Sequence, residues 1–279
     1  MGLKNLKNNI LTKIKGLIDI ILSPSMAFLP GNLAFFLVLS IFPVLTLFGV
    51  IASMFSIDVN SVIGLINSTL PSNIADVITA FMQGRGFDSH MGMFMIIGFI
   101  LASNGTHAMI LASNNLYGFK NDSYLKRRIK ALFLIVLLLL LFIFMLGFIA
   151  FGNKIIALLY QYVDNQELVD LIHQLFRILK WPFSIFVIYF NVKLIYTISP
   201  DHKIYSKDTT RGAVFTTLSW IVVIQIYTYW IENFANYDIF YGSLSNIVIL
   251  MLIIYLISFV LVIGIAINVK TYEYNEKKS

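Results

Sequence analysis

Long apolar runs alternate with short polar segments along the chain, and this pattern predicts six membrane-spanning helices. The clearest run follows Tyr241-Gly242-Ser243-Leu244 and continues to Asn268 without a charged residue. At ~1.5 Å per residue this run is ~36 Å long, which is enough to cross the hydrocarbon core of a bilayer with some tilt. The predicted spans cover residues 31–55, 91–115, 131–152, 181–199, 212–231 and 243–268.

The segments outside these spans are more polar and predict helices at the membrane surface. Apolar residues between Leu3 and Ile21 recur at three- and four-residue spacing with lysines off the stripe, which predicts a basic amphipathic helix. That helix lies either in the membrane interface or on the protein's own cytoplasmic face. Residues 56–90 predict short amphipathic helices. Residues 153–180 predict a polar loop with an amphipathic stretch through Leu168, Leu171, Leu175 and Ile178.

Three parts of the chain follow from this pattern. We expect an amphipathic helix at residues 1–24, a six-helix transmembrane domain at 25–270 and a cytoplasmic tail at 271–279. The predicted fold class is therefore an all-α integral membrane protein.

Proline and glycine mark positions where the spans are expected to bend or to pack closely. Pro43 lies inside the first span, where it removes a backbone N–H and predicts a kink. Pro200 ends the fourth span and Gly242 precedes the sixth. Gly264, with Asn268, predicts a close helix contact inside the sixth span. We interpret these two prolines and two glycines as hinge or structural positions.

The charged residues set the expected orientation. Only 12% of residues are charged, against about 25% in soluble domains, so lipid is the main solvent of this chain. Of the twenty Lys and Arg residues, fifteen fall on the side of the predicted topology that holds both termini and four on the other, and Lys193 lies within a span. Basic residues favour the cytoplasmic side, so both termini are expected in the cytoplasm. The net charge of +6 then needs no nucleic-acid partner.

Polar residues inside the predicted spans are the candidates for a functional site, because a polar group in a membrane is costly. They could line a substrate path, or they could form interhelical hydrogen bonds that only hold the bundle together. They comprise Ser103, Asn104, His107 and Asn114 in the second span, Gln225 in the fifth, and Asn246 and Tyr255 in the sixth.

Enzyme and metal signatures are missing from the sequence. The chain has no cysteine, no Walker A loop, no H-E-x-x-H and no G-x-S-x-G, and its four histidines are spread over different predicted segments. We therefore expect no catalytic residue, no metal site and no cofactor.

Several short motifs occur along the chain, and their order is informative. They are the run from Leu33 to Pro43, Ala102-Ser103-Asn104-Gly105, the run from Leu194 to Pro200, and Tyr241-Gly242-Ser243-Leu244 followed by Gly264 and Asn268. In this order they resemble the YihY/BrkB family of bacterial inner-membrane proteins, over about residues 25–270. Two positions depart from the family pattern. Asn104 stands where arginine is expected in many relatives, and Ala266-Ile267 stands where an acidic residue often precedes the asparagine.

The resemblance implies six helices in the bacterial cytoplasmic membrane with both termini inside. The family was formerly labelled ribonuclease BN, which these residues do not support, and its members are linked with serum resistance and with movement of envelope lipids or solutes. Our first hypothesis is a transporter or a lipid or solute translocase, in contact with membrane lipids and with a lipid or small-solute substrate. The alternative is a non-catalytic envelope scaffold that binds partners. An RNA-processing role for the Lys126–Lys130 run is disfavoured, and the sequence leaves the oligomeric state open.

Overall fold

The computed structural model describes residues 24–54, 91–163, 165–234 and 241–276, with isolated positions at 18, 22, 60, 63, 64, 67, 72, 75, 79 and 237. These residues are helical apart from short turns. The helices are α2 (Pro24–Met54), α5 (Met91–Tyr117), α6 (Tyr124–Tyr162), α7 (Gln166–Ile198), α8 (Ser206–Asn233) and α10 (Ser245–Glu276), with a short 3-10 helix, η1 (Gly242–Leu244), before α10. The amphipathic helix expected at 1–24 and the short helices expected at 56–90 lie outside the continuously described residues.

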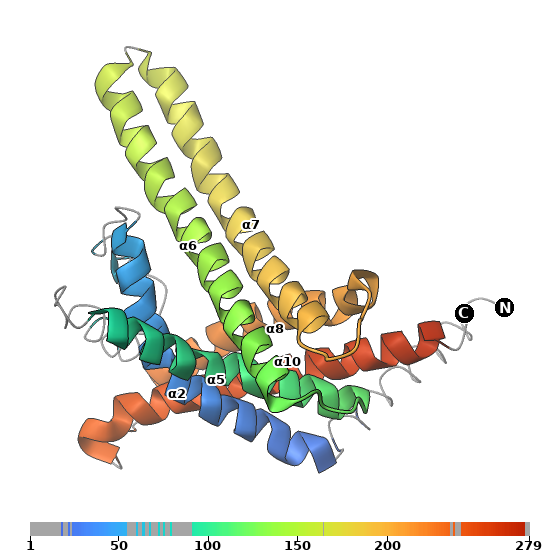
Figure 1. Cartoon of the computed structure of the whole chain (residues 1–279). Coiled ribbons are helices and arrows are strands. Elements are labelled where there is room, and N and C mark those ends of the chain that lie inside the picture. The colour runs from blue at the N-terminus through green and yellow to red at the C-terminus, as the bar shows by residue number, and fades with distance from the viewer. Residues whose placement is uncertain are drawn as a thin grey trace.

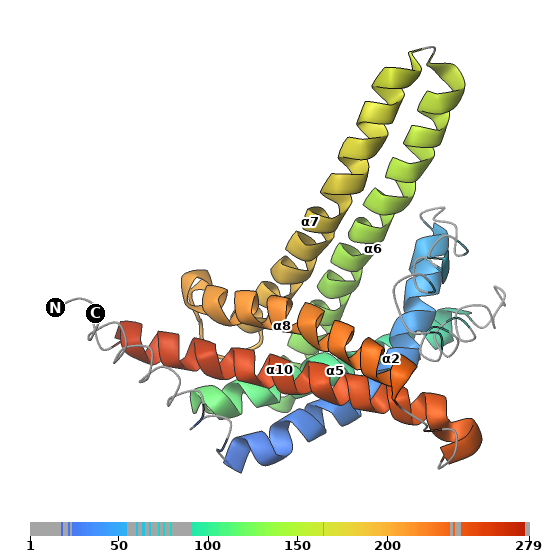
Figure 2. The same ribbon diagram turned by 180° about the vertical axis from the view of Figure 1, so that it is seen from behind.

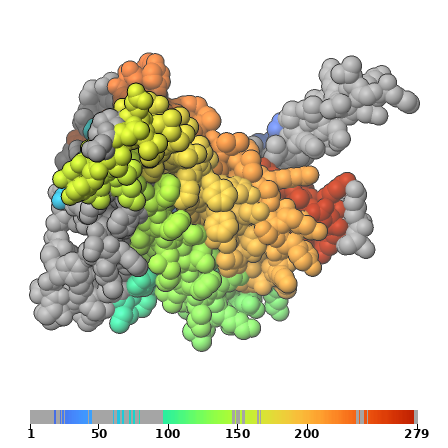
Figure 3. Space-filling view, turned by 90° about the horizontal axis from the view of Figure 1, so that it is seen from above, coloured from blue at the N-terminus to red at the C-terminus, as the bar shows by residue number. Residues whose placement is uncertain are grey.

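The described helices form two groups. Helices α2, α5, α8 and α10 run beside one another, while α6 and α7 form a long antiparallel hairpin that projects away from them (Figures 1 and 2). Helix α10 packs against α8, α2 and α5, and α6 and α7 join this group through α5 and α8. Seen from above, the surface of the hairpin borders that of α8, and the end of α10 lies at the edge of the molecule (Figure 3).

Within the described residues, five helices are long and apolar enough to cross a membrane. They are Ile96–Tyr117 of α5, Tyr124–Met145 of α6, Glu167–Ile198 of α7, and the whole of α8 and α10. The qualifying stretch of α2 is the shorter Met26–Ile41. The all-α membrane fold is thus present. The described residues contain five candidate spans. They cover only part of the first predicted span, 31–55, which falls on α2, so the count of six stays a prediction.

The polar loop predicted over residues 153–180 is wrong. Helix α6 continues to Tyr162 and α7 begins at Gln166, so only residues 163–165 separate them. The side chain of Asn165 starts α7 by accepting a hydrogen bond from the Leu168 N–H (3.1 Å). The polar residues of this stretch are mostly good helix formers, so polarity alone did not mark a helix end. The stripe Leu168, Leu171, Leu175 and Ile178 belongs to α7 and is exposed.

Several helices extend beyond their predicted spans. Helix α2 begins at Pro24, α8 begins at Ser206, and α10 continues to Glu276, through most of the predicted tail. Proline is well tolerated in the first turn of a helix, which suits Pro24. Pro43 lies inside α2, and the ribbon of this helix bends part-way along its length (Figures 1 and 2).

The main core lies where α2, α5, α7 and α10 meet. Leu33, Met109, Tyr196 and Val262, one from each helix, are buried together there. A second apolar cluster joins α2, α8 and α10 around Ala34, Tyr227 and Ile253. These two clusters hold α10 in the centre of the bundle.

Candidate functional site

Of the buried polar residues of α5, Ser103 bonds within its own helix, whereas Thr106 and the Gly105 N–H join α5 to the neighbouring helices. Ser103 is fully buried, and its Oγ donates to the carbonyl of Ile100 in its own helix (2.8 Å). Thr106 Oγ1 donates across to the carbonyl of Ala131 in α6 (2.8 Å). On the α2 side, Ser40 Oγ accepts from the Gly105 N–H (3.0 Å). These contacts satisfy buried polar groups and bring α5 close to both neighbouring helices.

Asn104 has a charged partner from α6. The Arg128 guanidinium donates through Nη1 to Asn104 Oδ1 (2.8 Å) and through Nη2 to the Ile100 carbonyl. No described carboxylate pairs with Arg128. An arginine side chain therefore reaches the middle of α5 from the neighbouring helix, and the sequence pattern gave no sign of this contact.

His107 lies close to the same basic residues. Its ring makes an edge contact with Tyr124, with 5.7 Å between ring centroids, and its Nε2 is buried without a hydrogen-bond partner. Arg127 and Arg128 are both close enough to affect the imidazole electrostatically. Asn104, His107 and the start of α6 thus form one polar and basic crossing point.

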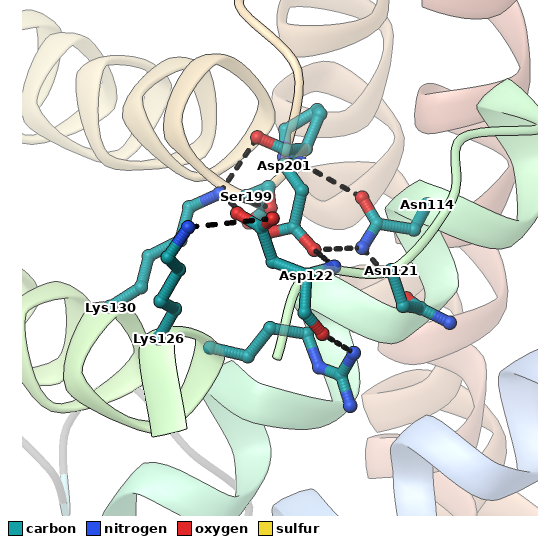
Figure 4. A network of polar contacts seen from close by, with 9 residues as sticks. Asn114, Asn121, Asp122, Lys126, Lys130, Ser199 and Asp201 are labelled. Atoms are coloured by element: carbon teal, nitrogen blue, oxygen red, sulfur yellow. Dashed lines mark hydrogen bonds and ion pairs between the residues drawn. The ribbon is translucent and has the colours of Figure 1, made fainter. Parts of the chain in front are cut away.

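Asn114 belongs to a separate network at the end of α5 (Figure 4). Its Nδ2 donates to Asp201 Oδ2 (2.6 Å) and to Asn121 Oδ1 (2.8 Å), and its Oδ1 accepts from the Asp201 N–H (2.8 Å). Asp201 also forms an ion pair with Lys130 (3.1 Å). Lys130 Nζ donates to the Ser199 and Pro200 carbonyls as well (2.9 and 2.7 Å). The network joins the end of α5, the start of α6 and the α7–α8 connection.

Asp201 is held in its charged form by this network. Burial by itself would raise its pKa, because desolvation disfavours the carboxylate. The hydrogen bonds from the Asp122 N–H, Asn114 and Lys130, together with the charge of Lys130, outweigh burial and lower the pKa of Asp201 below its ordinary value. The network is therefore an ionised contact at neutral pH.

The other three residues of the predicted path lie apart from α5. Gln225 of α8 is exposed, Asn246 near the start of α10 is half-buried, and Tyr255 is 41% exposed. No hydrogen bond within the described residues links any of them to the polar side chains of α5. The structure thus places Asn104 and His107 together, Asn114 in the network with Asp201, and the remaining three elsewhere.

A close contact between α7, α8 and α10 surrounds Gly264. Tyr196 OH donates to the Leu261 carbonyl (2.8 Å) and accepts from Thr216 Oγ1 (2.6 Å). A Cβ added at Gly264 would collide with both Tyr196 OH and Thr216 Oγ1. The Gly212 N–H donates to the buried Asn268 Oδ1 (2.8 Å) in the same contact. Tyr196 is central here, and sequence reasoning missed it because an isolated tyrosine in a span has no distinguishing pattern.

The two remaining hinge candidates lie at helix ends. Pro200 is buried in the α7–α8 connection beside Lys130. Gly242 begins η1 with φ +51°, a left-handed conformation that favours glycine. Within the described residues, no group of three or more His, Asp and Glu residues is placed to hold a metal ion.

A cavity of about 430 Å³ opens between α2 and α5 beside Asn114. Its polar part is formed by Asn32, Asn114, Asn115 and Asn121, and its apolar part by residues such as Leu29, Leu33 and Leu111. Of the seven predicted path residues, only Asn114 lines it. Volumes of 300–1,000 Å³ with mixed apolar and polar walls are typical of ligand sites, so this cavity is the best candidate for one.

The comparisons with known proteins identify the family. A family model described as "Virulence factor BrkB" matches residues 22–279. The chain belongs to the BrkB family. Among curated BrkB relatives, the "Putative ribonuclease-like protein YfkH" of Bacillus subtilis is 27% identical over 243 residues, covering 85% of this chain and 87% of the relative. A UPF0761 membrane protein of Vibrio vulnificus is 28% identical over 247 residues, covering 84% of this chain and 74% of the relative. No solved structure matches this BrkB chain significantly.

Proposed function

We propose that this BrkB-family membrane protein is a transporter, or a translocase of lipids or small solutes, in the bacterial cell envelope. The observation that carries the proposal is the cavity between α2 and α5. It combines an asparagine-rich polar part with an apolar part, and it opens between two helices of a membrane protein. A site of this kind suits a molecule that is partly polar and partly apolar.

Asn104 lies on the same face of α5 as residues that line the cavity, and this placement supports the proposal. Ala108, Leu111 and Asn115 line the cavity from α5, and Asn104 lies one turn before Ala108 on the same helix face. The Asn104–Arg128 contact therefore lies where a path from the cavity into the bundle would continue. Pro43, inside α2, and the turn at Gly242 are the positions at which we expect such a path to open.

The proposed orientation rests on charge and on helix direction. The start of α2 and the end of α10 lie toward the same end of the helical group in Figures 1 and 2. In the predicted topology, the basic α5–α6 and α7–α8 connections lie on the same side of the membrane as both termini. Basic connections favour the cytoplasmic side. We therefore expect the cavity to open on the cytoplasmic side of the inner membrane, with both termini in the cytoplasm.

Reconstitution tests the proposal. Purified full-length protein in liposomes is expected to move fluorescent lipids or encapsulated solutes faster than protein-free liposomes do. Asn32→Trp, which fills the cavity from an exposed position of α2, is expected to slow this movement. Leu39→Trp is a matched control, because Leu39 is exposed on the same helix and does not line the cavity. Movement that is equal with and without protein would reject the proposal.

The long hairpin favours a second candidate, a scaffold that binds envelope partners. Helices α6 and α7 extend well beyond their neighbours (Figure 1). The leucine-rich stripe of α7 is exposed. Cross-linking in cells from the hairpin tip, for example at Tyr162, distinguishes the two. A stoichiometric protein partner together with no lipid or solute movement would favour the scaffold.

We propose no ribonuclease activity for this chain. The ribonuclease-like name belongs to the relative YfkH. In the run proposed for RNA contact, Lys130 pairs with Asp201 and Arg128 with Asn104, so these two side chains are engaged within the protein. Metal-dependent cleavage of RNA by purified protein would overturn this view.

A further inference from the structure

The walls of the α2–α5 cavity carry no charged side chain among the described residues. Twelve residues line it: Phe28, Leu29, Asn32, Leu33, Ala108, Leu111, Ala112, Asn114, Asn115, Gly118, Phe119 and Asn121. The polar ones are asparagines, which both donate and accept hydrogen bonds. Lys120 lies next in sequence to two of these residues, but it is exposed and outside the lining.

The amides differ in what they can still bind. Asn114 is occupied, because its Nδ2 and Oδ1 bond Asp201 and Asn121. Asn121 uses Oδ1 for Asn114 and keeps both Nδ2 hydrogens. Asn32 has no hydrogen-bond partner in the described part of the chain, so its donors and its acceptor are both available. A partner that donates and accepts in return, such as a hydroxyl group, matches this set.

The charged residues next to the cavity wall, Asp201 and Lys130, neutralise each other and leave no net charge facing the cavity. Asp201 lies behind Asn114, and the ion pair with Lys130 at 3.1 Å neutralises it. A phosphate in the cavity would have no cation in the lining, and an ammonium group would have no carboxylate. Burying an unpaired charge is costly, so the lining disfavours head groups of either charge.

The apolar part of the cavity suits a ligand that also has a hydrocarbon tail. Leu29, Leu33 and Leu111 form apolar wall, and Phe28 lines the cavity while 53% exposed, which joins the cavity to the outer surface of α2. We propose that the cavity binds a lipid whose head group is uncharged and rich in hydroxyls, the chemistry of a glycosyl diacylglycerol. This inference names the substrate class of the proposed translocase and rests on that function for its role, though not for binding itself.

Binding measured separately from transport tests the inference. Full-length protein in detergent is titrated, by native mass spectrometry, with monoglucosyl diacylglycerol, with phosphatidylglycerol of the same acyl chains, and with methyl glucoside as the free sugar. The glycolipid is expected to bind at least about tenfold more tightly than either competitor, because each of these lacks either the uncharged head group or the tail. Asn32→Leu is expected to weaken glycolipid binding about tenfold by removing the free amide. Phe35→Leu, on the exposed face of α2 outside the lining, is expected to leave it unchanged.

Each other outcome overturns the inference. Tighter binding of phosphatidylglycerol would show an anionic site, equal binding of methyl glucoside would show a free-sugar site, and equal effects of the two substitutions would place the lipid elsewhere. The proposed function fails differently. Glycolipid that binds through Asn32 but is not moved across liposomes would uphold the substrate class and reject the translocase. Asn32-dependent movement of phosphatidylglycerol, with no movement of the glycolipid, would uphold the translocase and reject the substrate class.

Discussion

Asn114 and Asp201 are joined by two hydrogen bonds across 87 residues of sequence. Asn114 Nδ2 donates to Asp201 Oδ2 at 2.6 Å, and the Asp201 N–H donates to Asn114 Oδ1 at 2.8 Å. Asn114 also lines the cavity between α2 and α5. The shape of the cavity wall therefore depends on the α7–α8 connection, which carries Asp201.

Removing the charge of Asp201 is expected to destabilise the protein. Asp201→Asn leaves Lys130 without its carboxylate, and the Lys130 side chain is only 23% exposed. We expect the free energy of unfolding to fall by about 2 kcal/mol, which is less than for a fully buried pair. Thermal or denaturant unfolding in detergent measures this. Asp122→Asn is the control, because Asp122 is 48% exposed and its ion pair with Lys126 is long, at 4.0 Å. This substitution is expected to change the free energy of unfolding by less than about 0.5 kcal/mol.

The same pair predicts a pH dependence of stability. The pKa of Asp201 is lowered in the folded protein, so its contribution is fully present above the ordinary aspartate pKa of about 4 and is lost as the pH falls through the folded pKa. The melting temperatures of the native protein and Asp201→Asn are expected to differ at neutral pH and to converge below about pH 4. A difference that stays constant down to pH 3 would contradict the assigned ionisation.

The contact at Gly264 predicts a strong steric effect. Gly264→Ala places a methyl group against Tyr196 OH and Thr216 Oγ1, and overpacking of this kind costs about 1–3 kcal/mol. Gly31→Ala is the matched control, since no atom of the described residues lies within 4 Å of its added Cβ. Adding Tyr196→Phe to Gly264→Ala is expected to cost less than the sum of the two single changes, because it removes the colliding hydroxyl. Full additivity of the unfolding free energies would argue against the contact.

Local pattern predicted the helices well and their partners poorly. The apolar runs located α5, α8 and α10, because twenty or more apolar residues have few other solutions. The loop expected over 153–180 was wrong, since Glu167 and Asp170 are compatible with a helix whose start depends on the Asn165 cap. The Asn114–Asp201 and Arg128–Asn104 contacts join residues on different helices, and periodicity along one helix carries no information about them.

The Asn104–Arg128 contact predicts an effect on transport. Asn104→Leu removes the side-chain acceptor of the guanidinium and leaves it only the Ile100 carbonyl. Because this contact lies where the path from the cavity would continue, the rate of lipid or solute movement in liposomes is expected to fall several-fold. Asn191→Leu serves as the control, since among the described residues Asn191 bonds only to the Val187 carbonyl of its own helix. An equal rate for the two variants would remove Asn104 from the path.

Chemical blocking of a thiol at the cavity wall tests whether the cavity is the substrate site. The chain has no cysteine, so Asn32→Cys creates a single thiol at the cavity wall, and Leu39→Cys creates one outside it. Both variants are reconstituted in liposomes, and the movement of fluorescent lipid is measured before and after reaction with a bulky maleimide. We expect labelling to stop lipid movement by Asn32→Cys protein and to leave movement by Leu39→Cys protein unchanged. Undiminished movement by fully labelled Asn32→Cys protein would contradict the cavity as the substrate site.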